Sequence, residues 1–362
     1  MGVPPRPFRH WGRAAVQIMR DEGVEIAFGC PGAALLPLYA AMEEAGGIEH
    51  LPVRHEEAAA HMADGWARTS GKVGVAAVAA GPGAARLVTG LYAAQQDAVP
   101  LVCLTGREGA GPGSGGRLRH AGFRPPDLLR LAGAVTKRAE RIEDPARIPG
   151  AFREAFRIAR DGRPGPVLID VPADLAAAEI VYDAERTAES GFRPPQAGTR
   201  RAAAERAAPA RDTRPAPAAV AEIADAFGPD AYVVSGAVGA YARSGPPGWE
   251  VPAAIGVRKA LDSRGERDAE VVVVVDGHGW PFMAEELAAA ARHEVPFVLI
   301  TLTPPGQDTD FTDPVKLVEA YGCAGRHLAG PADPAELRSV TEWARKEAVS
   351  TRRPVLIEVR PV

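Results

Sequence analysis

Residues 73–105 read VGVAAVAAGPGAARLVTGLYAAQQDAVPLVCLT and contain two apolar runs separated by a helical segment. The first run, Val73–Ala80, has the length of a buried strand and ends at a Gly-Pro-Gly turn at 81–83. Helical spacing follows over residues 84–96, and Pro100–Thr105 is a second strand-like run. Because neither strand has a polar face, we expect parallel strands in a sheet that is covered by helices on both sides.

The same alternation continues on both sides of this unit and predicts two doubly wound parallel-sheet α/β domains joined by a linker. Residues 187–217 are rich in Ala, Arg and Pro and have no sustained apolar face, so they are the predicted linker between domains at 1–186 and 218–362. Further strands are expected at residues 24–29, 166–171, 232–235, 271–275, 296–302 and 355–359. Further helices are expected at residues 12–23, 35–44, 56–69, 145–160, 252–261, 283–292, 314–321 and 334–350.

The composition is that of an ordinary globular protein. Hydrophobic residues make up 46% of the chain and the net charge is −4, which gives no sign of a nucleic-acid or membrane-surface partner. No apolar run reaches the roughly 18 residues that a membrane helix needs, and the N-terminal segment lacks the apolar core of a signal peptide. We therefore expect a cytoplasmic protein whose three cysteines, odd in number and widely spaced, are free thiols.

Five ordered motifs connect the first domain to a known family. They read EIAFGCPG at 25–32, RHEEAAAHMADG at 54–65, GPG at 81–83, DAVPL at 97–101 and GRPGPVLID at 162–170. With these motifs, the domain resembles the pyrimidine-binding domain of thiamine-diphosphate enzymes of the acetolactate synthase and glyoxylate carboligase type. Residues 245–256, GPPGWEVPAAIG, are similar to the diphosphate-binding domain of glyoxylate carboligase. The predicted linker would stand in place of the family's third, central domain.

The resemblance implies a cofactor, a substrate class and an assembly. Thiamine diphosphate would act as the electron sink for making or breaking a carbon–carbon bond of a 2-oxo acid. Glu56 matches the glutamate that hydrogen-bonds a ring nitrogen of the cofactor's aminopyrimidine and activates it, although an acid is also favourable at any helix start. The family implies a homodimer or homotetramer with the cofactor between domains of neighbouring chains. Cofactor contacts would include Gly81, Pro82 and Gly83, and substrate contacts Arg107, Phe123 and Arg124.

The second domain departs from the family at the metal–diphosphate anchor. The family holds the diphosphate through a divalent cation, with an aspartate from a Gly-Asp-Gly turn and an amide oxygen from an Asn pair. Here the turn reads VDGHG at 275–279, so the ligand position falls on Gly277 or His278, with Asp276 beside them. The Asn pair falls on Thr303 and Pro304, and no shift in register restores the amide because the chain contains no Asn.

The metal, if one is bound, is therefore undetermined. Magnesium prefers oxygen ligands such as Asp276, whereas the imidazole of His278 suits zinc or another transition metal, and His278 is equally an ordinary polar turn residue. Pro247 stands where the family has the bulky residue that bends the cofactor. Without a metal, the diphosphate would carry about three negative charges that need cationic or amide partners. Two arginines, Arg243 and Arg258, are available for this.

Three functions remain open from the sequence. The first is a thiamine-diphosphate carboligase or decarboxylase with a non-standard metal or none, in which Glu56 and His278 are catalytic. The second is an enzyme of specialised metabolism on the same fold that has lost the cofactor and uses Glu56, His278 or Asp276 for acid–base chemistry. The third is a non-catalytic binding or regulatory subunit, because a fold alone does not fix a function.

Overall fold

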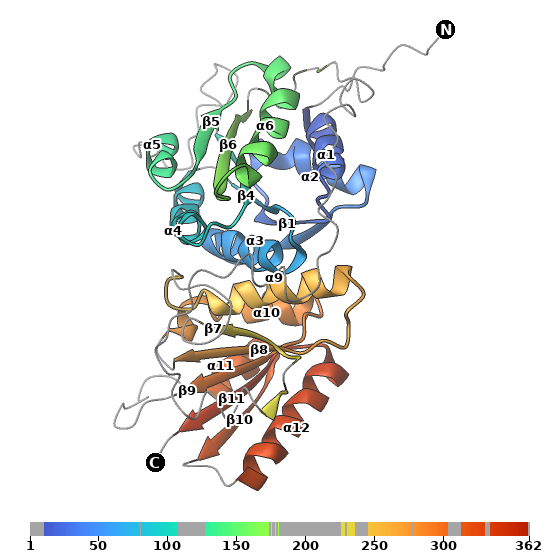
Figure 1. Ribbon diagram of the computed structural model, residues 1–362, viewed down its shortest axis with the longest axis vertical. Helices are drawn as coiled ribbons and strands as arrows, with labels where there is room; N and C mark the ends of the chain where they lie inside the picture. The colour runs from blue at the N-terminus through green and yellow to red at the C-terminus, as the bar shows by residue number, and fades with distance from the viewer. Residues whose placement is uncertain are drawn as a thin grey trace. The chain divides into compact units, whose positions relative to one another are not determined.

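The computed structural model describes two compact α/β units, each built around its own parallel sheet (Figure 1). None of the helices in the described ranges is long and apolar enough to cross a membrane. The predicted linker at 187–217 lies outside the described residues. The described residues are 11–79, 81–107, 127–173, 226–228, 230–235, 245–276, 279–302, 313–329 and 334–360, together with 175, 178 and 180.

The first unit contains a six-stranded sheet in the order β2-β1-β3-β4-β6-β5, with every neighbouring pair parallel. The strands that were expected from apolar runs occupy the middle of the sheet, where both faces are covered. The strands are β1 (Ile26–Cys30), β2 (Glu49–Pro52), β3 (Gly74–Val78), β4 (Leu101–Arg107), β5 (Arg138–Arg141) and β6 (Pro166–Pro172).

Helices cover both faces of this sheet. On one face lie α1 (Trp11–Asp21), α2 (Leu36–Ala45) and α6 (Ile148–Arg160), which bury their apolar side chains against the sheet. The other face carries α3 (Glu56–Ser70) and α4 (Pro82–Gln96), with the short α5 (Leu128–Gly133) beside α4. Small residues let α3 and α4 approach closely, because a Cβ atom on Gly90 would lie only 2.5 Å from the Cβ atom of Ala60.

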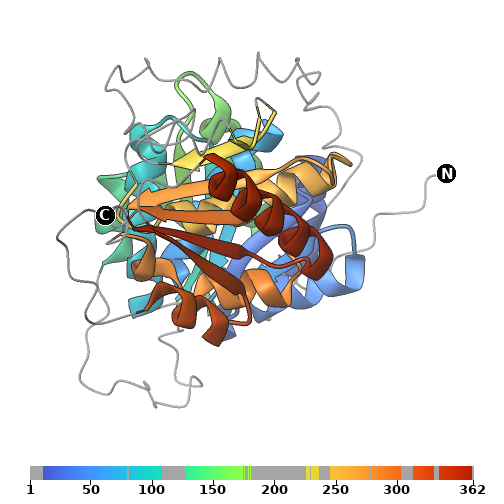
Figure 2. The same cartoon turned by 90° about the horizontal axis from the view of Figure 1, so that it is seen from below.

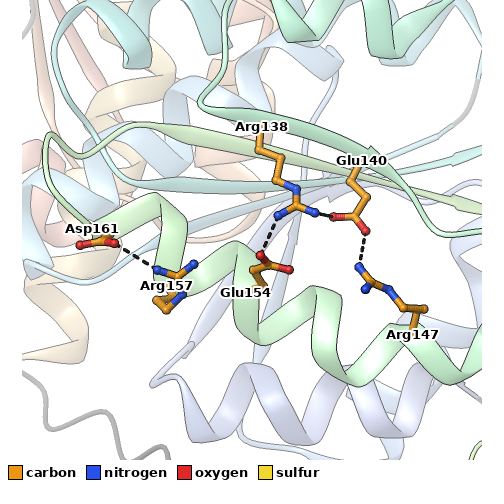
Figure 3. Close-up of polar contacts among 6 residues, drawn as sticks. All are labelled: Arg138, Glu140, Arg147, Glu154, Arg157 and Asp161. Atoms are coloured by element: carbon orange, nitrogen blue, oxygen red, sulfur yellow. Dashed lines mark hydrogen bonds and ion pairs between the residues drawn. The ribbon is translucent and has the colours of Figure 1, made fainter.

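The edge strand β5 is attached to α6 by a network of ion pairs (Figure 3). Arg138 Nη1 donates to Glu154 Oε1 at 2.7 Å, and Arg138 Nη2 lies 2.6 Å from Glu140 Oε2 on the same strand. Glu140 also accepts from Arg147, just before α6, at 2.8 Å. These side chains are partly exposed, so each pair contributes at most about 1 kcal/mol to stability. Their charges also discourage the edge from pairing with a strand of another molecule.

The second unit contains a five-stranded parallel sheet in the order β10-β11-β9-β8-β7. One face packs on the long helix α12 (Pro334–Thr351) (Figure 2). There Val340, Ala344 and Ala348 join the core cluster formed by valines and isoleucines of the sheet. The helices on the opposite face are α9 (Glu250–Ser263), α10 (Glu286–Arg292) and α11 (Pro314–Ala320). The strands are β7 (Tyr232–Ser235), β8 (Val271–Asp276), β9 (Val298–Leu302), β10 (Ala324–Ala329) and β11 (Val355–Arg360).

The expected fold class is confirmed. Every helix and strand that the sequence predicts is present, with ends shifted by a few residues. Three strands, β2, β5 and β10, were not expected, and neither was α5.

Candidate functional site

Glu56 is the first residue of α3, and its side chain is only 15% exposed. Glu57 follows it, so that two acids occupy the positive end of the helix dipole. The Glu57 side chain contacts its own helix, since its Oε1 lies 3.5 Å from Nε2 of His61, one turn later in α3. Glu56 instead points to the start of α4, and the two neighbouring acids therefore have different surroundings.

The start of α4 is shaped to accommodate the Glu56 carboxylate. Gly81 precedes the helix with a φ of 80°, a left-handed conformation that favours glycine, and Pro82 occupies the first helical position. A Cβ atom on Gly83 would lie 2.3 Å from Oε1 of Glu56. The absence of a side chain at Gly83 therefore allows the carboxylate to lie directly against the helix backbone.

Arg86 holds the other oxygen of the same carboxylate. Its Nη1 donates to Oε2 of Glu56 at 2.9 Å, a typical length for a charge-assisted hydrogen bond. The Arg86 side chain is 53% exposed and is the only charged side chain in α4. The sequence does not single out Arg86. The one feature that marks Arg86 in the sequence is that it is the single charged residue of its helix. Its partner Glu56 can be identified only from the packing of α3 against α4.

In the second unit, strands β8 and β9 end side by side. Asp276, the last residue of β8, is the backbone partner of Leu302, the last residue of β9. The carboxyl ends of neighbouring parallel strands form the edge at which α/β proteins commonly bind ligands. The predicted anchor residues Gly277, His278 and Thr303 directly follow these two strand ends in the sequence.

Pro247 lies in the turn that leads into α9 and is exposed. The next residue, Gly248, has a φ of 87°, and a Cβ atom there would lie 2.8 Å from the carbonyl oxygen of Gly279. The turn that carries Pro247 therefore packs against the segment that follows β8. Three predicted cofactor positions, at Pro247, at the end of β8 and at the end of β9, thus belong to one region of the second unit.

Arg258 has a structural role and does not point to this edge. It is 2% exposed in α9, and its guanidinium donates to the carbonyl oxygens of Glu266 and Ala269 and pairs with Asp262 at 3.0 Å. Burial lowers the pKa of Arg258, and the Asp262 carboxylate acts in the opposite direction. The guanidinium thus closes the loop after α9, and we no longer consider it a partner for the diphosphate.

The remaining predicted site residues are described in part or not at all. The side chains of Arg107 and Asp276 are not described, although their strands are. Within the described ranges, no three His, Cys, Asp or Glu side chains are close enough together to hold a metal ion. Outside the described residues lie Phe123, Arg124, Arg243, Gly277, His278 and Thr303.

The first unit matches a known family. Residues 9–120 match the family described as thiamine pyrophosphate enzyme, N-terminal TPP binding domain. Over residues 9–120, the first unit is therefore similar to a thiamine pyrophosphate enzyme N-terminal domain. Glu56, Gly83 and Arg86 all belong to the matched part of this domain.

Two enzymes are each similar to about half of the chain. The chain is 41% identical over 171 residues to the glyoxylate carboligase of Escherichia coli O157:H7. It is 43% identical over 170 residues to the acetolactate synthase large subunit of Haemophilus influenzae. Each match covers 47% of this chain, but only 28% and 29% of the two relatives. The chain therefore matches less than a third of the length of these enzymes.

A solved structure extends the likeness in fold to the second unit. The thiamine diphosphate-dependent 4-hydroxybenzoylformate decarboxylase of Rhodococcus jostii RHA1 superimposes with a TM-score of 0.73. The match covers 97% of this chain and 99% of that chain at 17% identity. At this identity the match concerns architecture alone, and it includes the second sheet because it covers 97% of this chain.

Proposed function

We propose that this chain binds thiamine diphosphate and makes or breaks a carbon–carbon bond of a 2-oxo acid, with a non-standard metal or none. The main support is the Glu56 carboxylate, which lies against the glycine backbone at Gly83 within a thiamine pyrophosphate N-terminal domain. Thiamine diphosphate, when bound, supplies an electron sink for this class of reaction. The tasks of the chain are to bind, orient and shield the reacting groups.

The starts of α3 and α4 fit the aminopyrimidine end of the cofactor. In its imino form the pyrimidine has a ring N–H, which needs an acceptor beside a surface that is free of side chains. Glu56 supplies the acceptor, and the backbone around Gly83 supplies such a surface. In this proposal, Glu56 accepts a hydrogen bond from the pyrimidine and holds the cofactor in its reactive orientation.

The diphosphate end of the cofactor is proposed to bind at the ends of β8 and β9. Asp276, Gly277, His278 and Thr303 are the candidate contacts, with Pro247 nearby. The chain has no Asn to supply the amide ligand, and Arg258 is engaged elsewhere. The negative charge must then be balanced by a metal on Asp276 or His278, or by backbone amides.

The substrate and the assembly follow from the same proposal. A 2-oxo acid carries a carboxylate, which suits an arginine such as Arg107 or Arg124, and Phe123 is a further candidate contact. We propose a homodimer or a homotetramer in which the cofactor contacts two chains.

The proposal is tested by calorimetric titration with thiamine diphosphate, alone and with magnesium, manganese or zinc. The informative variant is Glu56→Gln, and Glu57→Gln is the matched control because its side chain is also 15% exposed. We expect binding by the unaltered protein and by Glu57→Gln, and strongly weakened binding by Glu56→Gln. A folded protein that binds no thiamine diphosphate under any of these metal conditions would contradict the proposal.

One observation favours a second function, an enzyme on this fold that no longer uses the cofactor. The position of the amide ligand falls on Thr303-Pro304, and proline offers neither a side-chain oxygen nor a backbone N–H. Glu56, His278 or Asp276 would then act in acid–base chemistry on another small molecule. This second function would be favoured if the protein binds a metabolite saturably and does not bind thiamine diphosphate.

A further inference from the structure

The carboxylate of Glu56 is held at both oxygens by one helix. Arg86 binds Oε2 at 2.9 Å, and the backbone of Gly83 lies against Oε1. Both residues belong to α4, three positions apart, so a single rigid element sets the direction of the carboxyl group. A glutamate has three rotatable bonds, and an unsupported side chain at a helix start would sample several orientations.

One acceptor of this carboxylate stays available. Among the described residues, Arg86 Nη1 is the sole hydrogen-bond donor to Glu56, and it uses Oε2. Oε1 therefore keeps its capacity to accept a hydrogen bond from a ligand. Because Gly83 has no side chain, only backbone lies beside Oε1 on the side of α4.

We propose that Arg86 is a positioning residue that fixes Glu56 so that Oε1 faces the ring nitrogen of the ligand that carries a proton in the imino form. This inference rests on the proposed function, because the ligand class is the aminopyrimidine of thiamine diphosphate. Arg86 itself acts through Glu56 and need not touch the ligand. A partly exposed ion pair adds little to the stability of a fold, so conformational control of Glu56 is the larger effect of this pair.

The test compares Arg86→Gln with Arg86→Lys. Glutamine removes the charge, whereas lysine can keep the single ion pair because only one nitrogen of Arg86 contacts Glu56. We expect Arg86→Gln to bind thiamine diphosphate about three- to tenfold more weakly, the cost of reordering one long side chain. Arg86→Lys should recover most of that affinity. The control is Arg157→Gln, which removes the ion pair between Arg157 of α6 and Asp161, the residue that follows this helix. We expect this control to bind thiamine diphosphate like the unaltered protein.

Thermal unfolding and crystal structures separate this role from a structural one. The unfolding midpoints of Arg86→Gln and Arg157→Gln should fall by similar small amounts. In crystals, Glu56 should lie against Gly83 in the unaltered protein and turn away in Arg86→Gln. Equal affinity of Arg86→Gln and the unaltered protein, or an unmoved Glu56 in the variant, would overturn the positioning role.

The two proposals fail in different ways. If the unaltered protein binds no thiamine diphosphate, the proposed function fails, and with it the role of Arg86 toward that ligand. If the cofactor binds with equal affinity to the unaltered protein, to Arg86→Gln and to Arg86→Lys, only the role of Arg86 fails.

Discussion

Gly83 is the residue at which the geometry of the candidate site is most sensitive to substitution. A Cβ atom there would lie 2.3 Å from Oε1 of Glu56, so Gly83→Ala must displace the carboxylate. We expect this variant to lose most of its affinity for thiamine diphosphate and about 1–3 kcal/mol of stability. Gly150→Ala is the matched control, because a Cβ atom on Gly150 in α6 meets nothing within 4 Å. The control should be as stable as the unaltered protein or gain up to about 1 kcal/mol. Unchanged cofactor affinity of Gly83→Ala in titration calorimetry would contradict this account.

Arg258 is expected to matter for stability and not for the cofactor. Its buried guanidinium donates to two carbonyl oxygens and pairs with Asp262, so Arg258→Ala removes these bonds together with a large buried side chain. We expect a loss of about 3 kcal/mol or more in the free energy of unfolding. Arg157→Ala, which removes an exposed pair, should cost less than about 1 kcal/mol. Denaturant unfolding measures both losses. If folded Arg258→Ala protein loses cofactor affinity at full stability, then Arg258 belongs to the diphosphate site after all.

At the scale of elements, the sequence predicts the central strands and misses most edge strands. The runs that form β3, β4, β8 and β9 are apolar because both faces of these strands are covered. The unexpected strands β2, β5 and β10 all lie at sheet edges. Strand β5 reads RAER, and every residue in it is half-exposed. A polar, four-residue edge strand has no periodic apolar signal, so its pairing depends on the neighbouring strand and not on its own sequence.

The edge strand β10 is joined to α11 through charged side chains that respond to pH. Asp313 caps α11 by accepting from the amides of Val315 and Lys316 at 3.0 and 3.2 Å, and it lies 3.6 Å from His327 of β10. Partial burial opposes ionisation of Asp313, but these amides and the charges of His327 and Lys316 outweigh it and hold its pKa below the ordinary 3.8. A carboxyl group with a lowered pKa stabilises the folded state above its ordinary pKa. This contribution is lost as the pH falls through the folded value.

Asp313→Asn tests this link, because asparagine still caps a helix but does not titrate. We expect the variant to be less stable than the unaltered protein near neutral pH and about equally stable at a pH below the folded pKa of Asp313. Asp313→Ala also loses the cap and should cost about 1 kcal/mol more at both pH values. Urea unfolding over a pH series gives these differences. A gap between Asp313→Asn and the unaltered protein that stays constant with pH would show that the charge of Asp313 has no role.

For the whole molecule, the sequence predicts those candidate site residues that stand within short motifs, and it misses those whose partners are distant in the chain. Glu56 and Gly83 stand in motifs that can be found by spacing alone. Arg86 cannot be found in that way, because its partner is 30 positions away on another helix. For the predicted metal–diphosphate anchor, no spacing rule says which substitute ligand a loop will present. The sequence thus leads to the proposed pyrimidine end of the candidate site, whereas the choice of metal stays undetermined.

The proposed sharing of the cofactor between two chains leads to a prediction for mixtures of variants. Glu56→Gln is defective in the first unit and Asp276→Ala in the second, so each variant alone should bind thiamine diphosphate poorly. In a mixed dimer, one of the two shared sites combines an unaltered Glu56 with an unaltered Asp276. We therefore expect co-expressed variants, purified through two different tags, to regain part of the binding capacity in calorimetric titration. A site built within a single chain would regain nothing, because each chain keeps one defect. Sedimentation velocity supplies the control, since a protein that stays monomeric at micromolar concentration would contradict the shared site directly.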